Sequence, residues 1–219
     1  EILWTFFNQD GVVGFSLAMK VLIPILIGLL VGGCESNTKV VPNSPEAKAA
    51  IEAAIRKAAK KPTGELTKAD LEKVTGLSLY NNQLTDFTGL EKLTQLTSLD
   101  LNYNQLTDVK RLENLTKLRG LSLDNNQLTD VKGLEKLTKL KKLSLYKNKL
   151  TEVPKGLENL TQLTFLNLSA NRLTELPSLE KLNRLKTLRL WNNPALSKAQ
   201  IDKLQKALPK CDIGHNTKK

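Results

Sequence analysis

The sequence predicts an α/β solenoid, in which short parallel strands stack side by side and helical segments close both ends. Two features lead to this prediction: a sequence frame that recurs, and the near-constant spacing of its copies. One frame recurs six times between Val74 and Cys211: a leucine (valine in the first copy), two residues, leucine, one residue, leucine, two residues and asparagine. The copies begin at residues 74, 96, 118, 140, 163 and 185. A near-constant period is typical of stacked coils, because one copy is too small to bury its own apolar face.

Two leucine columns mark the strand of each copy. In the second copy they are Leu99 and Leu101, and a spacing of two residues directs both side chains to one face while the residue between them faces out. A second leucine pair, such as Leu112 and Leu115, closes the back of each coil. Because each copy supplies one strand and returns by a loop, we expect the strands to be parallel.

An asparagine column lies where the chain turns off each strand. Its members are Asn82, Asn104, Asn126, Asn148, Asn171 and Asn193. A short amide there can hydrogen-bond buried backbone groups of its own coil and of adjacent coils, which water does not reach. A row of ligand-binding amides is the alternative, but we interpret the column as structural.

These copies resemble the leucine-rich repeat family, specifically its 22-residue, internalin-like bacterial branch. The matching segments are Asn-Gln-Leu-Thr-Asp at 82–86, 104–108 and 126–130, each followed by Leu-Glu-x-Leu-Thr. The resemblance implies a curved parallel sheet on the concave side, short irregular or helical segments on the convex side, and partner recognition by the concave face. It specifies fold much more than function, because one fold hosts many activities.

The amino-terminal end of the solenoid needs a cap, since an open end exposes leucines and an unpaired strand edge. Residues 45–73 are predicted to form it, ahead of the repeats at 74–196. Ser44 can cap a helix that starts at Pro45 and runs through alanine-rich sequence. A second short helix is predicted to open at Thr67.

The carboxy-terminal end is predicted to close with a cap helix over 197–211. Ser197 and Gln200 have the spacing of a capping box, and an apolar helical stripe follows them. We expect residues 212–219 to be a disordered tail.

The segment before the caps has the three regions of a secretory signal at 19–33: a basic start, an apolar run and small residues. It ends in a motif that resembles a bacterial lipobox, which predicts a lipid on Cys34 and a polar tether over 34–44. Residues 1–18 are interpreted as an upstream extension. A single transmembrane anchor is the alternative, because the run from 11 to 33 is long enough to span a bilayer.

Chemistry-bearing residues are few. The one histidine, His215, falls in the predicted tail, and the sequence has neither a Cys/His cluster at metal spacing nor a glycine-rich phosphate loop. We therefore predict no catalytic site, no metal and no cofactor. Cys211 is expected to pack in the core and not to pair with Cys34.

The predicted binding site is the outward row of the sheet. Its residues are Tyr80, Asp100, Tyr103, Asp124, Lys142, Tyr146, Phe165, Arg189 and Trp191. Aromatic side chains make up only 5% of the chain, yet five of them fall on this row. Exposed aromatics are usual anchors of recognition surfaces, although aromatics also simply favour strands.

The first functional hypothesis is a monomeric, lipid-anchored bacterial envelope protein that binds a protein partner through its concave face. The net charge of +11 favours an acidic protein or an anionic envelope glycan, and the export signal argues against nucleic acid. A glycan- or lipopolysaccharide-binding module built on Tyr146, Phe165 and Trp191 is the alternative, and a structural envelope protein is a second one.

Overall fold

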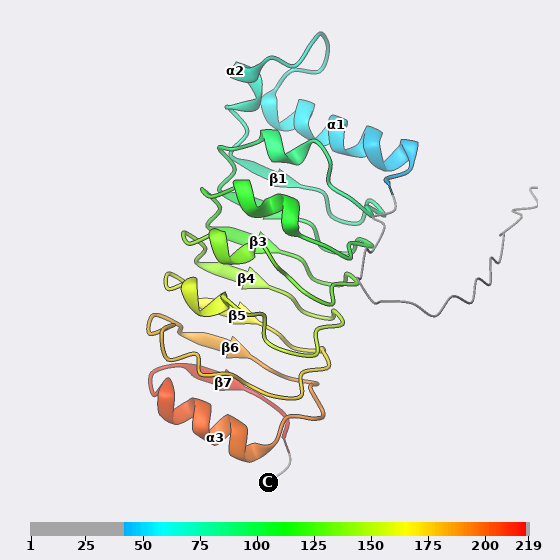
Figure 1. Cartoon of the computed structure of the whole chain (residues 1–219). Coiled ribbons are helices and arrows are strands. Elements are labelled where there is room, and N and C mark those ends of the chain that lie inside the picture. Colours follow the sequence, from blue (N-terminus) through cyan, green and yellow to red (C-terminus); the bar gives the residue numbers. More distant parts are fainter. Residues whose placement is uncertain (1–41, 218–219) are drawn as a thin grey trace, which may run out of the picture. The chain divides into compact units, whose positions relative to one another are not determined.

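Seven parallel strands lie side by side in chain order in the computed structural model, which describes residues 42–217 (Figure 1). The strands are β1 (Gly76–Ser78), β2 (Ser98–Asp100), β3 (Gly120–Ser122), β4 (Lys142–Ser144), β5 (Phe165–Asn167), β6 (Thr187–Arg189) and β7 (Asp212–Gly214). Leu77 aligns with Leu99, and the register continues coil by coil through Leu188. The predicted solenoid with parallel strands is confirmed.

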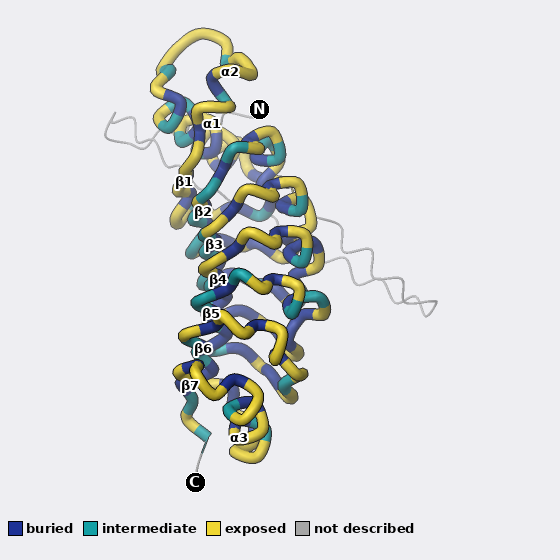
Figure 2. Tube along the Cα trace, turned by 90° about the vertical axis from the view of Figure 1, so that its left-hand side faces the viewer, coloured by how far each residue is buried: buried dark blue, intermediate teal, exposed yellow. Residues whose placement is uncertain are grey.

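Short 3-10 helices form the back of the coils, opposite the sheet. They are η1 (Leu90–Lys92), η2 (Lys110–Asn114), η3 (Leu134–Lys136) and η4 (Leu157–Asn159). The strand leucines and the back leucines are buried between the two layers, so the core is one continuous column of leucine. Figure 2 shows buried residues along the inside of the coils and exposed residues on the connecting loops.

The asparagine column bonds adjacent coils together. Asn126 Nδ2 donates to the carbonyl oxygens of Leu101 and Leu123, each at 3.0 Å, and its Oδ1 accepts from the Leu106 amide at 3.0 Å. Asn104, Asn148, Asn171 and Asn193 make equivalent contacts and are buried. The structural interpretation of this column is confirmed.

The residue before each asparagine adopts a left-handed backbone conformation. Its φ lies between 53° and 57° in every coil, at Asn81, Tyr103, Asn125, Lys147, Ala170 and Asn192. A positive φ is uncommon outside glycine, and asparagine tolerates it best. The conformation turns the chain off the sheet, and it places Tyr103 and Lys147 on the turns that follow β2 and β4.

The amino-terminal cap consists of α1 (Pro45–Ala59) and α2 (Lys68–Leu71). The Ser44 hydroxyl accepts from the Ala47 amide at 3.2 Å, and Thr67 forms a capping box at the start of α2. Both helices start where the sequence predicted.

The tether predicted over 34–44 is wrong at its carboxy-terminal end. Asn43 is buried: its Oδ1 accepts from the Thr85 and Asp86 amides, each at 2.9 Å, and its Nδ2 donates to the Asp86 carbonyl at 2.6 Å. Asn43 therefore bonds the segment before α1 to the first coil.

At the other end, α3 (Lys198–Ala207) begins with the predicted Ser197–Gln200 capping box. The prediction that 212–219 is a disordered tail is wrong for 212–214, which form β7. The Asp212 amide donates to the Lys186 carbonyl at 2.8 Å, and the Leu190 amide donates to the Gly214 carbonyl at 2.7 Å. Without β7, strand β6 would present its unpaired backbone groups at an open edge.

The predicted signal over 19–33, the extension over 1–18 and the lipidated Cys34 lie outside the described residues. Within residues 42–217, no helix has the length and apolar character needed to cross a membrane.

Candidate functional site

One face of the sheet points away from the 3-10 helices, and we call it the open face. Of the nine side chains that the sequence predicted for a binding site, eight lie on this face and Tyr103 lies on the turn beside it. Each of the nine is exposed or half-buried. Three large apolar side chains of residues 42–217 are clearly exposed: Tyr80 (51%), Tyr103 (49%) and Trp191 (43%). All three lie just beyond the carboxyl ends of strands, so they share one border of the open face.

The first two coils contribute an aromatic pair. The rings of Tyr80 and Tyr103 lie with centroids 5.1 Å apart and an interplanar angle of 51°. Aromatic pairs at this distance attract one another beyond their contact area. Each ring therefore helps to hold the other in a fixed place while both remain accessible to a partner.

The two aspartates of the open face accept hydrogen bonds from neighbouring groups of the sheet. Asp100 accepts from the Ser78 hydroxyl at 3.1 Å and from the Asn102 amide at 3.0 Å. Asp124 accepts from the Tyr146 amide of the next coil at 2.8 Å. Burial raises the pKa of Asp124, and the negative charge of Asp100 raises it further. These carboxylates therefore support the sheet in addition to shaping its surface charge.

The carboxy-terminal end of the open face depends on β7. The Trp191 ring stacks on His215, with centroids 6.5 Å apart and an interplanar angle of 21°, and Arg189 pairs with Asp212 at 3.0 Å. A Cβ on Gly214 would lie 2.5 Å from Trp191 Nε1, so glycine is required for the ring to lie beside β7.

Sequence reasoning missed His215 and Asp212 as part of this surface. The register places His215 opposite Leu190, where the repeat frame expects a leucine. The sequence after β7 also lacks an asparagine at the position that the frame requires. The isoleucine at 213, aligned with Leu188, was the remaining signal of a seventh copy.

The proposed aromatic group of Tyr146, Phe165 and Trp191 does not form one platform. Phe165 starts β5 and lies opposite Thr187 of β6. Thr187 is four residues before Trp191, so Phe165 and Trp191 are offset by about 13 Å along the strand direction. Tyr146 and Phe165 are also less accessible than Trp191, because both are half-buried whereas Trp191 is exposed. This arrangement gives no support to a compact sugar-stacking site.

Reactive chemistry has little basis in the described residues. Residues 42–217 contain no group of three or more His, Cys, Asp or Glu side chains that could hold a metal ion. Cys211 is buried as predicted, and burial raises the pKa of its thiol, which makes the nucleophilic thiolate less available.

Comparison with known families identifies the repeats. The family described as Leucine Rich repeats (2 copies) matches residues 72–115, 116–159 and 161–206. The chain belongs to the leucine-rich repeat family. No curated protein matches the sequence of this leucine-rich repeat protein.

Solved bacterial structures share the fold. Internalin C2 of Listeria monocytogenes is 28% identical, with a TM-score of 0.58 over 78% of this chain and 85% of that chain. A leucine-rich repeat protein of Leptospira interrogans is 36% identical, with a TM-score of 0.62 over 66% of this chain and 38% of its own. The functional domain of InlJ from Listeria monocytogenes is 28% identical, with a TM-score of 0.63 over 76% of this chain and 41% of its own. The protein therefore spans less than half of the last two chains.

Proposed function

We propose that this leucine-rich repeat protein is a non-catalytic module that binds a partner protein through its open face. The observation that supports the proposal most is the placement of Tyr80, Tyr103 and Trp191, the clearly exposed large apolar side chains of residues 42–217, on one border of that face. Tyrosine and tryptophan are enriched among the residues that dominate binding energy. Leucine-rich repeat domains are also typical of protein-binding modules.

The size of the sheet indicates that the partner also contacts the turns. Seven strands spaced by about 4.8 Å give a sheet about 29 Å wide, with only a few residues of each strand on the open face. That area is smaller than the roughly 800 Å² that each partner contributes to a standard interface. Tyr103 and Lys147 project from the turns and would enlarge the contact.

Substitution of the exposed aromatics tests this proposal. The partner would first be captured by cross-linking in native envelopes, and its dissociation constant measured by calorimetry. We expect Tyr103→Asn and Trp191→Ala each to weaken binding by at least about 1 kcal/mol, as loss of a buried anchor does. Tyr103→Asn keeps the left-handed backbone, because Asn81 and Asn125 already adopt it.

Charge changes separate the open face from the back of the coils. Lys142→Glu on the open face should mainly slow association with an acidic partner and reduce the salt dependence of the rate. Lys92→Glu, on η1, is the matched control and should change neither. Arg189 is a poorer probe, because its pairing with Asp212 would be broken at the same time. Loss of binding in Lys92→Glu with unchanged binding in Lys142→Glu and Trp191→Ala would contradict the proposal.

We further propose that the protein is attached to a bacterial envelope by a lipid on Cys34. The lipobox-like sequence that ends at Cys34 supports this proposal. Mass spectrometry of the membrane-extracted protein should find an amino-terminal lipidated cysteine, and Cys34→Ser should abolish it. An unmodified Cys34 within an intact 1–33 segment would favour the transmembrane alternative.

A further inference from the structure

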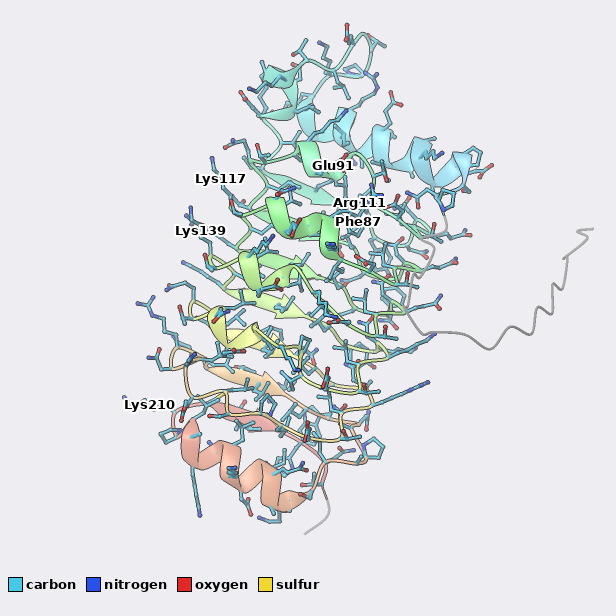
Figure 3. All side chains as sticks on the ribbon, viewed as in Figure 1. Phe87, Glu91, Arg111, Lys117, Lys139 and Lys210 are labelled. Carbon is cyan, nitrogen blue, oxygen red and sulfur yellow. The ribbon has the colours of Figure 1, made fainter. Side chains whose placement is uncertain are left out.

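A line of basic side chains follows the edge of the sheet at which the chain enters the strands. We call it the basic edge; it consists of Lys117, Arg119, Lys139, Lys141, Arg184, Lys186 and Lys210. All seven residues are exposed. Figure 3 shows Lys117, Lys139 and Lys210 on the same side of the molecule, pointing away from the ribbon. The aromatic border of the open face lies at the opposite ends of the strands.

The charge of the basic edge is not neutralised by neighbouring carboxylates. None of the seven cations forms an ion pair with another of the described residues. The entry loops of β3 to β7, at 115–119, 137–141, 160–164, 182–186 and 208–212, contain one carboxylate, Asp212, which pairs with Arg189.

Some cations elsewhere on the solenoid do pair with acids. At the back of the coils Lys136 pairs with Glu113 at 2.6 Å, and in the loop that leads from β3 to η3 Lys132 pairs with Asp130 at 3.1 Å. The basic edge differs in that seven cations, unpaired within residues 42–217, lie along one edge, whose entry loops hold a single carboxylate. A concentrated potential of one sign attracts ligands of the opposite sign.

The solenoid arranges these cations in a line. The strand register repeats the entry loops at about 4.8 Å, so the basic edge from β3 to β7 extends about 19 Å. The cations lie in the loops before β3, β4, β6 and β7, and the loop before β5 has none. Four of the five loops also hold an exposed hydrogen-bond donor: Thr116, Thr138, Thr161 and Asn183. The Arg184 guanidinium donates to the neutral Gln162 side chain at 2.6 Å, which positions it without removing its charge.

We propose that the basic edge binds a linear phosphodiester polymer that lies along the solenoid axis. Lysine and arginine contact phosphate oxygens through charge-assisted hydrogen bonds, and hydroxyl and amide side chains add further donors. A flat anionic membrane fits less well. Membrane-surface binding relies on apolar side chains as well as charge, and the clearly exposed large apolar residues of 42–217 lie at the other ends of the strands.

The test uses a poly(glycerol phosphate) oligomer long enough to span the basic edge, with binding to the full chain followed by fluorescence anisotropy at several salt concentrations. The variant combines Lys117→Gln, Lys139→Gln, Arg184→Gln and Lys210→Gln. Glutamine is compatible with this column because Gln95 and Gln162 occupy it in two other coils. The control variant carries the same charge change elsewhere, as Lys92→Gln, Lys155→Gln, Lys181→Gln and Lys203→Gln.

We expect the basic-edge variant to bind at least about tenfold more weakly at low salt. The slope of log affinity against log salt should fall by about 2–3, because each lost phosphate contact removes about 0.7 from it. The control variant should bind within about twofold of the wild type. Trp191→Ala should leave polymer binding unchanged, because Trp191 lies at the opposite ends of the strands. Failure of the open-face proposal would therefore be distinguishable from failure of the basic-edge proposal.

Two results would overturn the inference: the wild-type protein does not bind the oligomer, or both quadruple variants lose the same amount of affinity for it. If the wild type binds phosphatidylglycerol vesicles but not the oligomer, and the basic-edge variant binds the vesicles more weakly, then the basic edge binds a membrane and the inference is also overturned. Equal unfolding midpoints of the two variants would exclude a folding defect as the cause of lost binding.

Discussion

At the scale of single residues, the buried asparagines add side-chain hydrogen bonds between adjacent coils to the backbone bonds of the sheet. Each inner asparagine satisfies backbone groups of two coils at once, as Asn126 does for Leu101, Leu106 and Leu123. The first member of the column differs. Asn82 is half-buried, and its side-chain amide donates to the Tyr80 carbonyl of its own coil.

This difference predicts unequal effects of two identical substitutions. Asn126→Ala should lower the free energy of unfolding by about 2–5 kcal/mol, because it leaves buried backbone groups without partners. Asn82→Ala should cost about 1 kcal/mol or less, since its one bond lies near solvent. Urea unfolding followed by circular dichroism measures both. Equal losses would mean that the column does not act through bonds between coils.

At the scale of elements, the charged side chain of Asp70 stabilises the loop that joins the two helices of the amino-terminal cap. Asp70 in α2 pairs with Lys61 at 2.7 Å and with Lys73 at 3.1 Å, and it accepts from the Thr67 amide at 3.1 Å. These hydrogen bonds, with Lys61 the largest contribution, hold the pKa of Asp70 well below its usual value of 3.8. The ionised carboxylate therefore ties α2 to the end of α1.

A lowered pKa makes the contribution of Asp70 dependent on pH. Its stabilising effect should be present above the usual aspartate pKa of 3.8 and should be lost as the pH falls through the lower folded pKa. The difference in urea midpoint between wild type and Asp70→Asn should therefore be largest near neutral pH and should shrink below pH 3.8. Glu52→Gln, which removes an exposed ion pair within α1, is the control. A difference that stays constant down to pH 2 would contradict this role for the Asp70 charge.

At the scale of the whole molecule, stability depends on contacts between neighbouring coils. Each strand pairs with the next in the same register, and the buried leucines form one cluster from the amino-terminal cap to α3. No coil has a core of its own. Damage in a middle coil should therefore spread to its neighbours.

Leu121→Ala tests this dependence, because Leu121 lies in the central region of the sheet, on β3, and is only 2% exposed. We expect the free energy of unfolding to fall by about 2–5 kcal/mol, the range for loss of a buried leucine. Hydrogen exchange should show faster opening of β2 and β4 as well as β3. Leu176→Ala, at a half-buried position outside the strands, should cost less. A wild-type midpoint for Leu121→Ala would contradict the repeat register.

The repeat frame by itself determined the parallel strands, the leucine core, the asparagine column and which residues face out. These follow from periodicity, because six copies place each column in the same environment and each copy confirms the others. Only the tertiary structure decided the single-copy features: Asn43 bonding the first coil, β7 beside β6, and His215 under Trp191. It also decided which charges are compensated, since the open-face Arg189 is paired while Lys117 and Lys210, far apart in sequence, share one edge. Such contacts depend on which segments meet at the ends and edges of the stack, where no neighbouring copy repeats the signal.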